Sequence, residues 1–122
     1  VDDYKVWGNA ESLEEMVLIF LDNAVKYTPQ GGQVTVRTRK ARKFLVIEIA
    51  DTGVGIAEKD LPRVFDRLYR ADQSRSKDKV AGFGLGLSLA KRIIELHQGS
   101  VEASSVLNEG TAFTVKLPLE HF

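Results

Sequence analysis

The sequence has no cysteine, no excess of charge of one sign and no long apolar run, and each absence excludes a class of protein. Without cysteine, neither disulfides nor thiolate metal sites are available. Lysines plus arginines number 17, as do aspartates plus glutamates, so net charge does not draw the chain to nucleic acid or to an anionic membrane. No apolar run approaches the ~18 residues that a membrane-spanning helix requires.

The chain also lacks an initiating methionine and a signal peptide, and it opens at Val1. We therefore expect a fragment of a longer protein. Its 122 residues are 43% apolar and 28% charged, which suits one globular domain spanning residues 1–122.

Apolar periodicity and turn residues predict an α+β domain. Helices are expected over residues 12–28, 58–64 and 85–97, and strands over 3–7, 34–38, 44–50, 100–105 and 111–117. Ser12 is expected to cap the first helix, with Glu15 completing a capping box, and Gly99 to close the last helix. Hairpins separated by helices favour a two-layer sandwich, a mixed and mainly antiparallel sheet of about five strands covered by about three helices. The apolar strand 44–50 should be central.

Six of the ten glycines fall in three clusters, at 53 and 55, at 82, 84 and 86, and at 110. A turn explains any one cluster, because glycine is the default turn residue. The triplet in GFGLGL (82–87) also opens the last predicted helix, and amides at a helix N-terminus hold phosphate groups well. Because this triplet does not follow a strand in a βαβ unit, it fails as a dinucleotide-binding signature.

Three polar side chains allow two interpretations each. Asp51 ends an apolar strand before a glycine loop, where it either closes a turn or accepts a hydrogen bond from an amino group such as that of adenine. Asn23 lies among apolar neighbours in the first helix, either as a structural hydrogen bonder or as an oxygen ligand for Mg²⁺. Lys26, on an adjacent part of that helix, is either solvated or in contact with a phosphate. These residues alone leave the alternatives open.

Five segments in a fixed order narrow the choice. They are LDNAVKYT (21–28), DTGVGI (51–56), FDRLYRAD (65–72), GFGLGLSLAK (82–91) and EGTAF (109–113). Together they resemble the asparagine box, first glycine box, phenylalanine box, second glycine box and final glycine-threonine motif of the catalytic, ATP-binding domain of sensor histidine kinases. The resemblance covers nearly the whole chain. It implies the Bergerat α/β sandwich, which agrees with the predicted element order.

The resemblance also implies roles for individual residues. Asn23 would bind Mg²⁺, Lys26 would contact phosphate and Tyr27 would pack beside the nucleotide. Asp51 would read adenine, and Arg70 would reach the γ-phosphate when the domain docks on its substrate. The other residues implied in ATP binding are Gly53, Gly55, Ile56, Gly82, Phe83, Gly84, Leu85, Gly86, Leu87 and Thr111. Asn23, Lys26 and Arg70 would be the catalytic set.

Ile19 departs from the family pattern. Many members carry a second asparagine there, and the related ATPases carry a glutamate that activates water. Isoleucine cannot act as a base, which favours phosphotransfer over hydrolysis.

The reaction that the resemblance implies is transfer of the γ-phosphoryl group of Mg-ATP to a histidine, in two-component signal transduction. The chain has only His97 and His121, and neither lies in the family's helical phosphoacceptor motif. His97 is expected to interact with the end of its own helix. We therefore expect the acceptor on a separate dimerisation and phosphoacceptor domain upstream of Val1, a response regulator as a further partner, and a monomeric fragment. By resemblance, the domain would be cytoplasmic and its parent membrane-anchored.

Other functions remain as alternatives. A regulatory pseudokinase that binds nucleotide without transferring phosphate would share the residues named above. A related Bergerat-fold serine kinase or ATPase is disfavoured by FDRLYRAD and by Ile19. The basic stretch RTRKARK (37–43) raises nucleic-acid binding, but Arg37 and Arg39 would simply share the solvated face of a strand.

Overall fold

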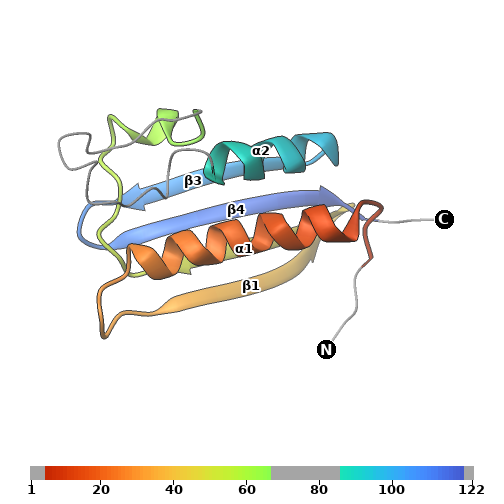
Figure 1. The fold of residues 1–122 in the computed structure, drawn as a ribbon. Coiled ribbons are helices and arrows are strands. Elements are labelled where there is room, and N and C mark those ends of the chain that lie inside the picture. The colour runs from red at the N-terminus through yellow and green to blue at the C-terminus, as the bar shows by residue number, and fades with distance from the viewer. Residues whose placement is uncertain (1–4, 67–85, 120–122) are drawn as a thin grey trace.

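A computed structural model describes residues 5–66 and 86–119, which form a sheet with helices on one face (Figure 1). The elements are α1 (Ala10–Lys26), β1 (Val34–Ala41), β2 (Phe44–Asp51), the 3-10 helix η1 (Leu61–Arg63), α2 (Gly86–Leu96), β3 (Ser100–Val106) and β4 (Gly110–Pro118). The predicted α+β sandwich is confirmed.

The four strands of the sheet lie in the order β1-β2-β4-β3, and every neighbouring pair is antiparallel. The described residues hold four strands, against a prediction of about five, and the difference lies in the N-terminal segment. Within the strand predicted at 3–7, Val6 forms an isolated bridge with Leu119, and residues 3 and 4 lie outside the described part. β2 is internal, as its apolar sequence predicts.

The number of helices also differs from the prediction of about three. The described residues hold two α-helices, and the predicted helix over 58–64 is the three-residue turn η1. Pro62 suits the first turn of a helix, but the helical conformation of this segment ends at Arg63.

The start of α1 corrects another expectation. Asn9, rather than Ser12, is the N-cap: its side-chain oxygen accepts a hydrogen bond from the Ser12 N–H at 2.8 Å. Asn9 also has the extended backbone of a cap residue, with φ −91° and ψ 116°. The helix therefore begins earlier than predicted, at Ala10.

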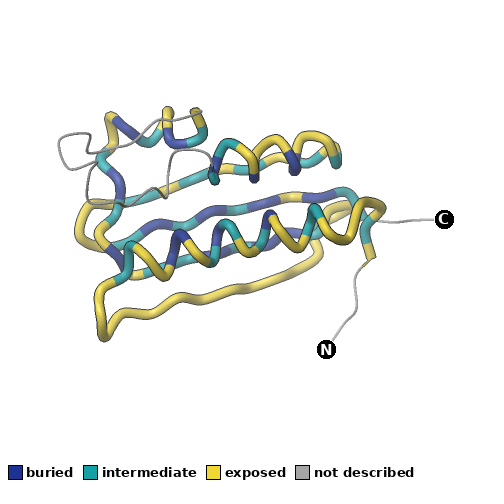
Figure 2. The backbone as a smooth tube through the Cα atoms, viewed as in Figure 1, coloured by how far each residue is buried: buried dark blue, intermediate teal, exposed yellow. Residues whose placement is uncertain are grey.

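The core lies between the helices and the sheet (Figure 2). Met16 and Phe20 of α1 are fully buried one helical turn apart, and the Phe20 ring lies 5.0 Å from that of Phe113 in β4. α2 adds Leu87 and Ile94, both fully buried. Spacing at three and four residues puts these side chains on the face of each helix that covers the sheet.

The other sheet face carries Arg37 and Arg39, as predicted. Arg37 lies opposite Glu48, and Arg39 opposite Val46. Val46 is only 2% exposed, although the described helices all lie on the far side of the sheet. Its cross-strand neighbours Arg39 and Lys116 carry long aliphatic stems, which account for this burial.

The end of α2 is a Schellman motif at Gln98, so the predicted closure by Gly99 is displaced by one residue. Gln98 has φ 63°, and the Gly99 N–H donates to the Ile94 carbonyl at 2.9 Å. Gly99 is needed for close packing instead, because a Cβ there would collide with the Lys116 carbonyl oxygen.

His97 connects the ends of the two helices. Its Nε2 accepts a hydrogen bond from the Asn9 N–H at 3.0 Å, so the ring proton is on Nδ1, which lies 2.8 Å from the Ile93 carbonyl oxygen. The contact with its own helix end is as predicted, and the bond to Asn9 is not. Gly8 makes room for the ring, since a Cβ at Gly8 would collide with it.

Candidate functional site

The end of β2 carries Asp51 into the glycine loop. Asp51 is half-buried and lies opposite Thr111 of β4 in the strand register. Its Oδ1 accepts a hydrogen bond from the Gly53 N–H at 2.8 Å. The turn interpretation of Asp51 is therefore correct for one carboxylate oxygen, and a carboxylate has further acceptor capacity for a ligand amino group.

The glycine loop is fixed by its neighbours on both sides. The Val54 N–H donates to the Tyr27 carbonyl at 3.1 Å, and the Asn108 N–H donates to the Val54 carbonyl at 2.8 Å. These bonds attach the loop to the end of α1 and to the turn between β3 and β4.

Close contacts explain why two positions of the loop require glycine. A Cβ on Gly53 would collide with the Tyr27 carbonyl oxygen, and one on Gly55 with the Val106 carbonyl oxygen. Gly55 also has φ 76°, which favours glycine. The backbone segments pack so closely here that side chains are excluded.

Ser105 is a site residue that the sequence analysis missed. Its hydroxyl oxygen accepts from the Ile56 N–H at 2.7 Å and lies 2.7 Å from the Gly110 carbonyl and 2.8 Å from the Thr111 hydroxyl. Thr111 is 8% exposed. The register of the last hairpin, in which Ser105 faces Thr111, is the signal that could have revealed it. We call residues 51–56 together with 105–111 the loop junction.

The last turns of α1 lie beside the loop junction. Asn23 is buried, Lys26 is exposed, and Tyr27 is joined to the loop through its carbonyl. The Lys26 ammonium lies 3.2 Å from the Asp22 carboxylate, and both side chains are well exposed. An exposed pair of this kind is weak, so the lysine is available to a stronger anion.

The start of α2 lies against α1. A Cβ on Gly86 would lie 3.5 Å from Cγ2 of Ile19, so the position that departs from the motif pattern faces the last glycine of the GFGLGL segment. Leu87 is fully buried in the core, which leaves only its backbone for any ligand. Arg70, Gly82, Phe83, Gly84 and Leu85 lie outside the described residues.

Phe65, at the start of the phenylalanine box, packs edge-on against Phe113 with ring centroids 5.9 Å apart. Lys91 of α2 places its ammonium 5.7 Å from the Phe65 ring centre. The box is therefore anchored to the core at this residue.

The described part of the chain contains neither a cluster of metal-ligating side chains nor a helix that could span a membrane. No three histidine, aspartate or glutamate side chains gather there as a metal site would require. Neither α1 nor α2, nor η1, is long and apolar enough to cross a membrane.

Comparison with known proteins agrees with this arrangement. Residues 8–121 match the family described as histidine kinase-, DNA gyrase B- and HSP90-like ATPases. Over 102 residues the chain is 47% identical to the signal transduction histidine-protein kinase ArlS of Staphylococcus aureus, a match that covers 84% of this chain and 22% of ArlS. The chain thus spans about a fifth of that relative's length.

Solved structures show the same relationship. The mycobacterial sensor histidine kinase MprB is 32% identical, with a TM-score of 0.83 over 96% of this chain and 78% of that one. The catalytic domain of the histidine kinase ThkA shares the fold at 20% identity, with a TM-score of 0.77 over 93% of this chain and 71% of that one. The chain therefore belongs to the family of histidine kinase-, DNA gyrase B- and HSP90-like ATPases, as a catalytic domain of the sensor histidine kinase type.

Proposed function

We propose that residues 1–122 form one domain that binds Mg-ATP, with adenine at Asp51 and the phosphates between α1 and the start of α2. The observation that carries this proposal is the half-buried Asp51 carboxylate beside Thr111, in a loop attached to the end of the helix that bears Asn23. A carboxylate held in this way can accept a hydrogen bond from the exocyclic amino group of adenine. Thr111 and Ser105 add hydroxyl groups at the same end.

The residues present suit a magnesium ion shared with the nucleotide. Mg²⁺ takes oxygen ligands and usually keeps several waters alongside one or two protein oxygens and the substrate phosphates. Asn23, which is 5% exposed, would supply one amide oxygen from the last turns of α1. The ion, when bound, would neutralise part of the phosphate charge, and Lys26 and Arg70 would add positive charge from the protein.

The reaction we propose is transfer of the γ-phosphoryl group to a histidine nitrogen on a separate phosphoacceptor domain. The bond from the γ-phosphorus to ADP breaks as the bond to nitrogen forms, and this domain positions the reactants. His97 does not suit the acceptor role, because both of its ring nitrogens are engaged with backbone groups. Ile19 offers no base to activate water.

The partners follow from this reaction. They are the kinase's own dimerisation and phosphoacceptor domain and, for the whole kinase, a response regulator. We place the domain in the cytoplasm as part of a membrane-anchored kinase, and we propose that this chain alone is monomeric and does not bind nucleic acid.

Calorimetric titration with ADP and a non-hydrolysable ATP analogue, with and without Mg²⁺, tests the site. Asp51→Asn should weaken binding about 10- to 100-fold, because a hydrogen bond to a charged group is worth about 1.5–3 kcal/mol. Glu58→Gln is the matched control, because Glu58 is an exposed carboxylate. The nucleotide affinity of this variant should equal that of the wild type.

Unchanged affinity in Asp51→Asn, with circular dichroism showing intact folding, would contradict the assignment of the adenine end. If nucleotide binds as expected but no phosphate reaches a supplied phosphoacceptor domain, the domain is a regulatory nucleotide-binding module rather than a kinase.

A further inference from the structure

Three polar side chains form one row across the end of the sheet. In the strand register Thr111 of β4 lies opposite Asp51 of β2 on one side and opposite Ser105 of β3 on the other. Ile49 and Phe113, the next residues but one along β2 and β4, are 1% and 4% exposed in the core beneath the helices. Alternate residues of a strand share a face, so the polar row lies on the helix-covered face, next to the core.

The Ser105 hydroxyl has three hydrogen-bonding neighbours, and its single proton can serve only one of them. The Ile56 N–H donates to Ser105 Oγ at 2.7 Å, and the Gly110 carbonyl oxygen lies 2.7 Å from the same atom. A carbonyl can only accept, and two oxygens this close with no proton between them would repel each other. The Ser105 hydroxyl therefore donates to the Gly110 carbonyl.

The third neighbour, the Thr111 hydroxyl, lies 2.8 Å from Ser105 Oγ. Because the Ser105 proton is given to Gly110, the hydrogen bond between the two hydroxyls must use the Thr111 proton. Ser105 Oγ then accepts two hydrogen bonds, which occupies both of its lone pairs. Thr111 Oγ1, with its proton engaged, can only accept a hydrogen bond from a ligand, and the same is true of the ionised Asp51 carboxylate.

Two acceptors in one row select a ligand that donates. The 6-amino group of adenine donates hydrogen bonds, whereas the 6-oxo group of hypoxanthine or guanine only accepts them. An oxo group placed against these acceptors would lose its hydrogen bonds to water and gain none in return, which strongly disfavours binding. Thr111 is only 8% exposed, so little water is present to compensate.

We propose that Ser105 is a positioning residue for base selection, because it holds the Thr111 hydroxyl proton and so makes Thr111 an obligate acceptor. The site then binds purine nucleotides with a 6-amino group and rejects those with a 6-oxo group. Ser105 acts through Thr111, since its own hydrogen-bonding capacity is used within the protein. This inference rests on the proposed function, because it requires the base of the nucleotide to lie at Asp51 and Thr111.

The ratio of two dissociation constants tests the proposal. ADP and inosine diphosphate, which differ at position 6 and in the proton on N1, are titrated calorimetrically into the wild type and into Ser105→Ala. The wild type should bind ADP at least about 100-fold more tightly than inosine diphosphate. In Ser105→Ala the Thr111 hydroxyl can turn and donate, so this preference should fall about tenfold. The N1 proton is the same for both proteins and does not affect their comparison.

Two control variants separate positioning from a general loss of structure. Ser105→Thr keeps the hydroxyl and should keep the preference for ADP. Ser104→Ala makes the same change at the exposed neighbouring residue of β3, and its preference should stay within about twofold of that of the wild type. A purely structural role of Ser105 would weaken the binding of both nucleotides by the same factor and leave their ratio unchanged.

Thr111→Val gives a second test that leaves the hydrogen bonds of Ser105 to Ile56 and Gly110 in place. Loss of an acceptor should weaken the binding of ADP but not that of inosine diphosphate, so the preference should again fall about tenfold. If circular dichroism shows that Ser105→Ala does not fold, this variant decides the matter. An unchanged or larger preference in Thr111→Val would overturn the proposal.

A preference for ADP that is equal in the wild type and in folded Ser105→Ala would also overturn the inference and leave the proposed function standing. So would equal affinities of the wild type for the two nucleotides. A wild type that binds neither nucleotide would contradict the proposed function itself, and this inference would fail with it.

Discussion

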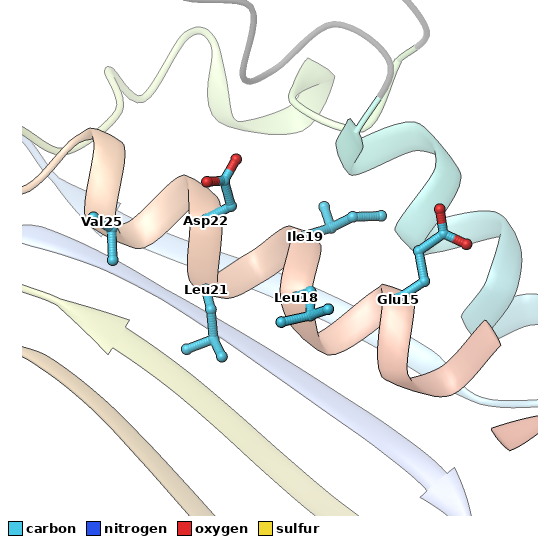
Figure 3. Close-up of a pocket in the computed structure, with 6 residues that line it drawn as sticks. All are labelled: Glu15, Leu18, Ile19, Leu21, Asp22 and Val25. Atoms are coloured by element: carbon cyan, nitrogen blue, oxygen red, sulfur yellow. The ribbon is translucent and has the colours of Figure 1, made fainter. Parts of the chain in front are cut away.

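The loop junction is built differently from a second region, the exposed residues Leu18 and Val25 of α1 with Val34 and Val36 of β1, which we call the apolar strip. At the loop junction, backbone carbonyls occupy the space of absent side chains, and the Ser105 hydroxyl connects three segments. In the apolar strip, large side chains face open space, as Figure 3 shows for those of α1. The difference teaches that close packing fixes this chain where we propose that adenine binds, whereas the apolar side chains of the strip are not fixed by such packing.

The largest expected effect is at Gly110. A Cβ there would collide with the Asp51 carbonyl oxygen, and Gly110 has φ 137°, a backbone conformation that other residues rarely adopt. Gly110→Ala should therefore lower the free energy of unfolding by about 3 kcal/mol or more, as measured by urea denaturation.

Gly31→Ala is the matched control at a glycine that has open space around it. Gly31 has φ 92°, but nothing lies within 4 Å of a Cβ there, so only backbone strain of about 1–2 kcal/mol applies. Equal losses for the two substitutions would mean that close packing at the loop junction contributes nothing.

A smaller effect is expected at Ser105. Ser105→Ala leaves the Ile56 N–H without its side-chain acceptor, at a cost of about 1–3 kcal/mol in unfolding free energy. Ser104→Ala, on the exposed neighbouring residue of β3, should change it by less than about 0.5 kcal/mol. Thermal denaturation measures the stability of both variants. Equal stability would show that the Ser105 hydroxyl does not stabilise the contact between these segments.

The smallest effect is expected in the apolar strip. Val36→Thr keeps the shape of the side chain and replaces a methyl with a hydroxyl that water can reach. The free energy of unfolding of the 122-residue chain should therefore change by less than about 0.5 kcal/mol. Denaturant unfolding measures it. A loss of about 2 kcal/mol in this chain would mean that the strip is already covered, and the contrast between the two regions would disappear.

The sequence predicts the elements where a local pattern decides them. The apolar run of β2 and the helical spacing of α1 place both elements close to their observed positions, and Gly110, the first residue of β4, marks the last hairpin. The N-cap was misassigned because Asn9 and Ser12 are both good caps, and only the geometry of the chain entering the helix chooses between them. Likewise Gln98, not the adjacent glycine, takes the left-handed position at the end of α2.

For the candidate site, the sequence identifies Asp51, Gly53, Gly55 and Thr111 through motifs, and the structure brings them together. It could not reveal Ser105 or the contact between the Tyr27 carbonyl and the glycine loop, because both depend on the register between distant segments. It also could not show that Leu87, adjacent to the second glycine box, has its side chain in the core.

The pairing of Asp51 with Thr111 has a consequence for how the domain folds. The two residues are about sixty positions apart, whereas β1–β2 and β3–β4 are local hairpins. Each hairpin closes a short loop, but the β2–β4 ladder must close a long one, which is the slower kind of step. The loop junction therefore exists only once both halves of the sheet have joined. A ligand bound across it would lower the rate of unfolding.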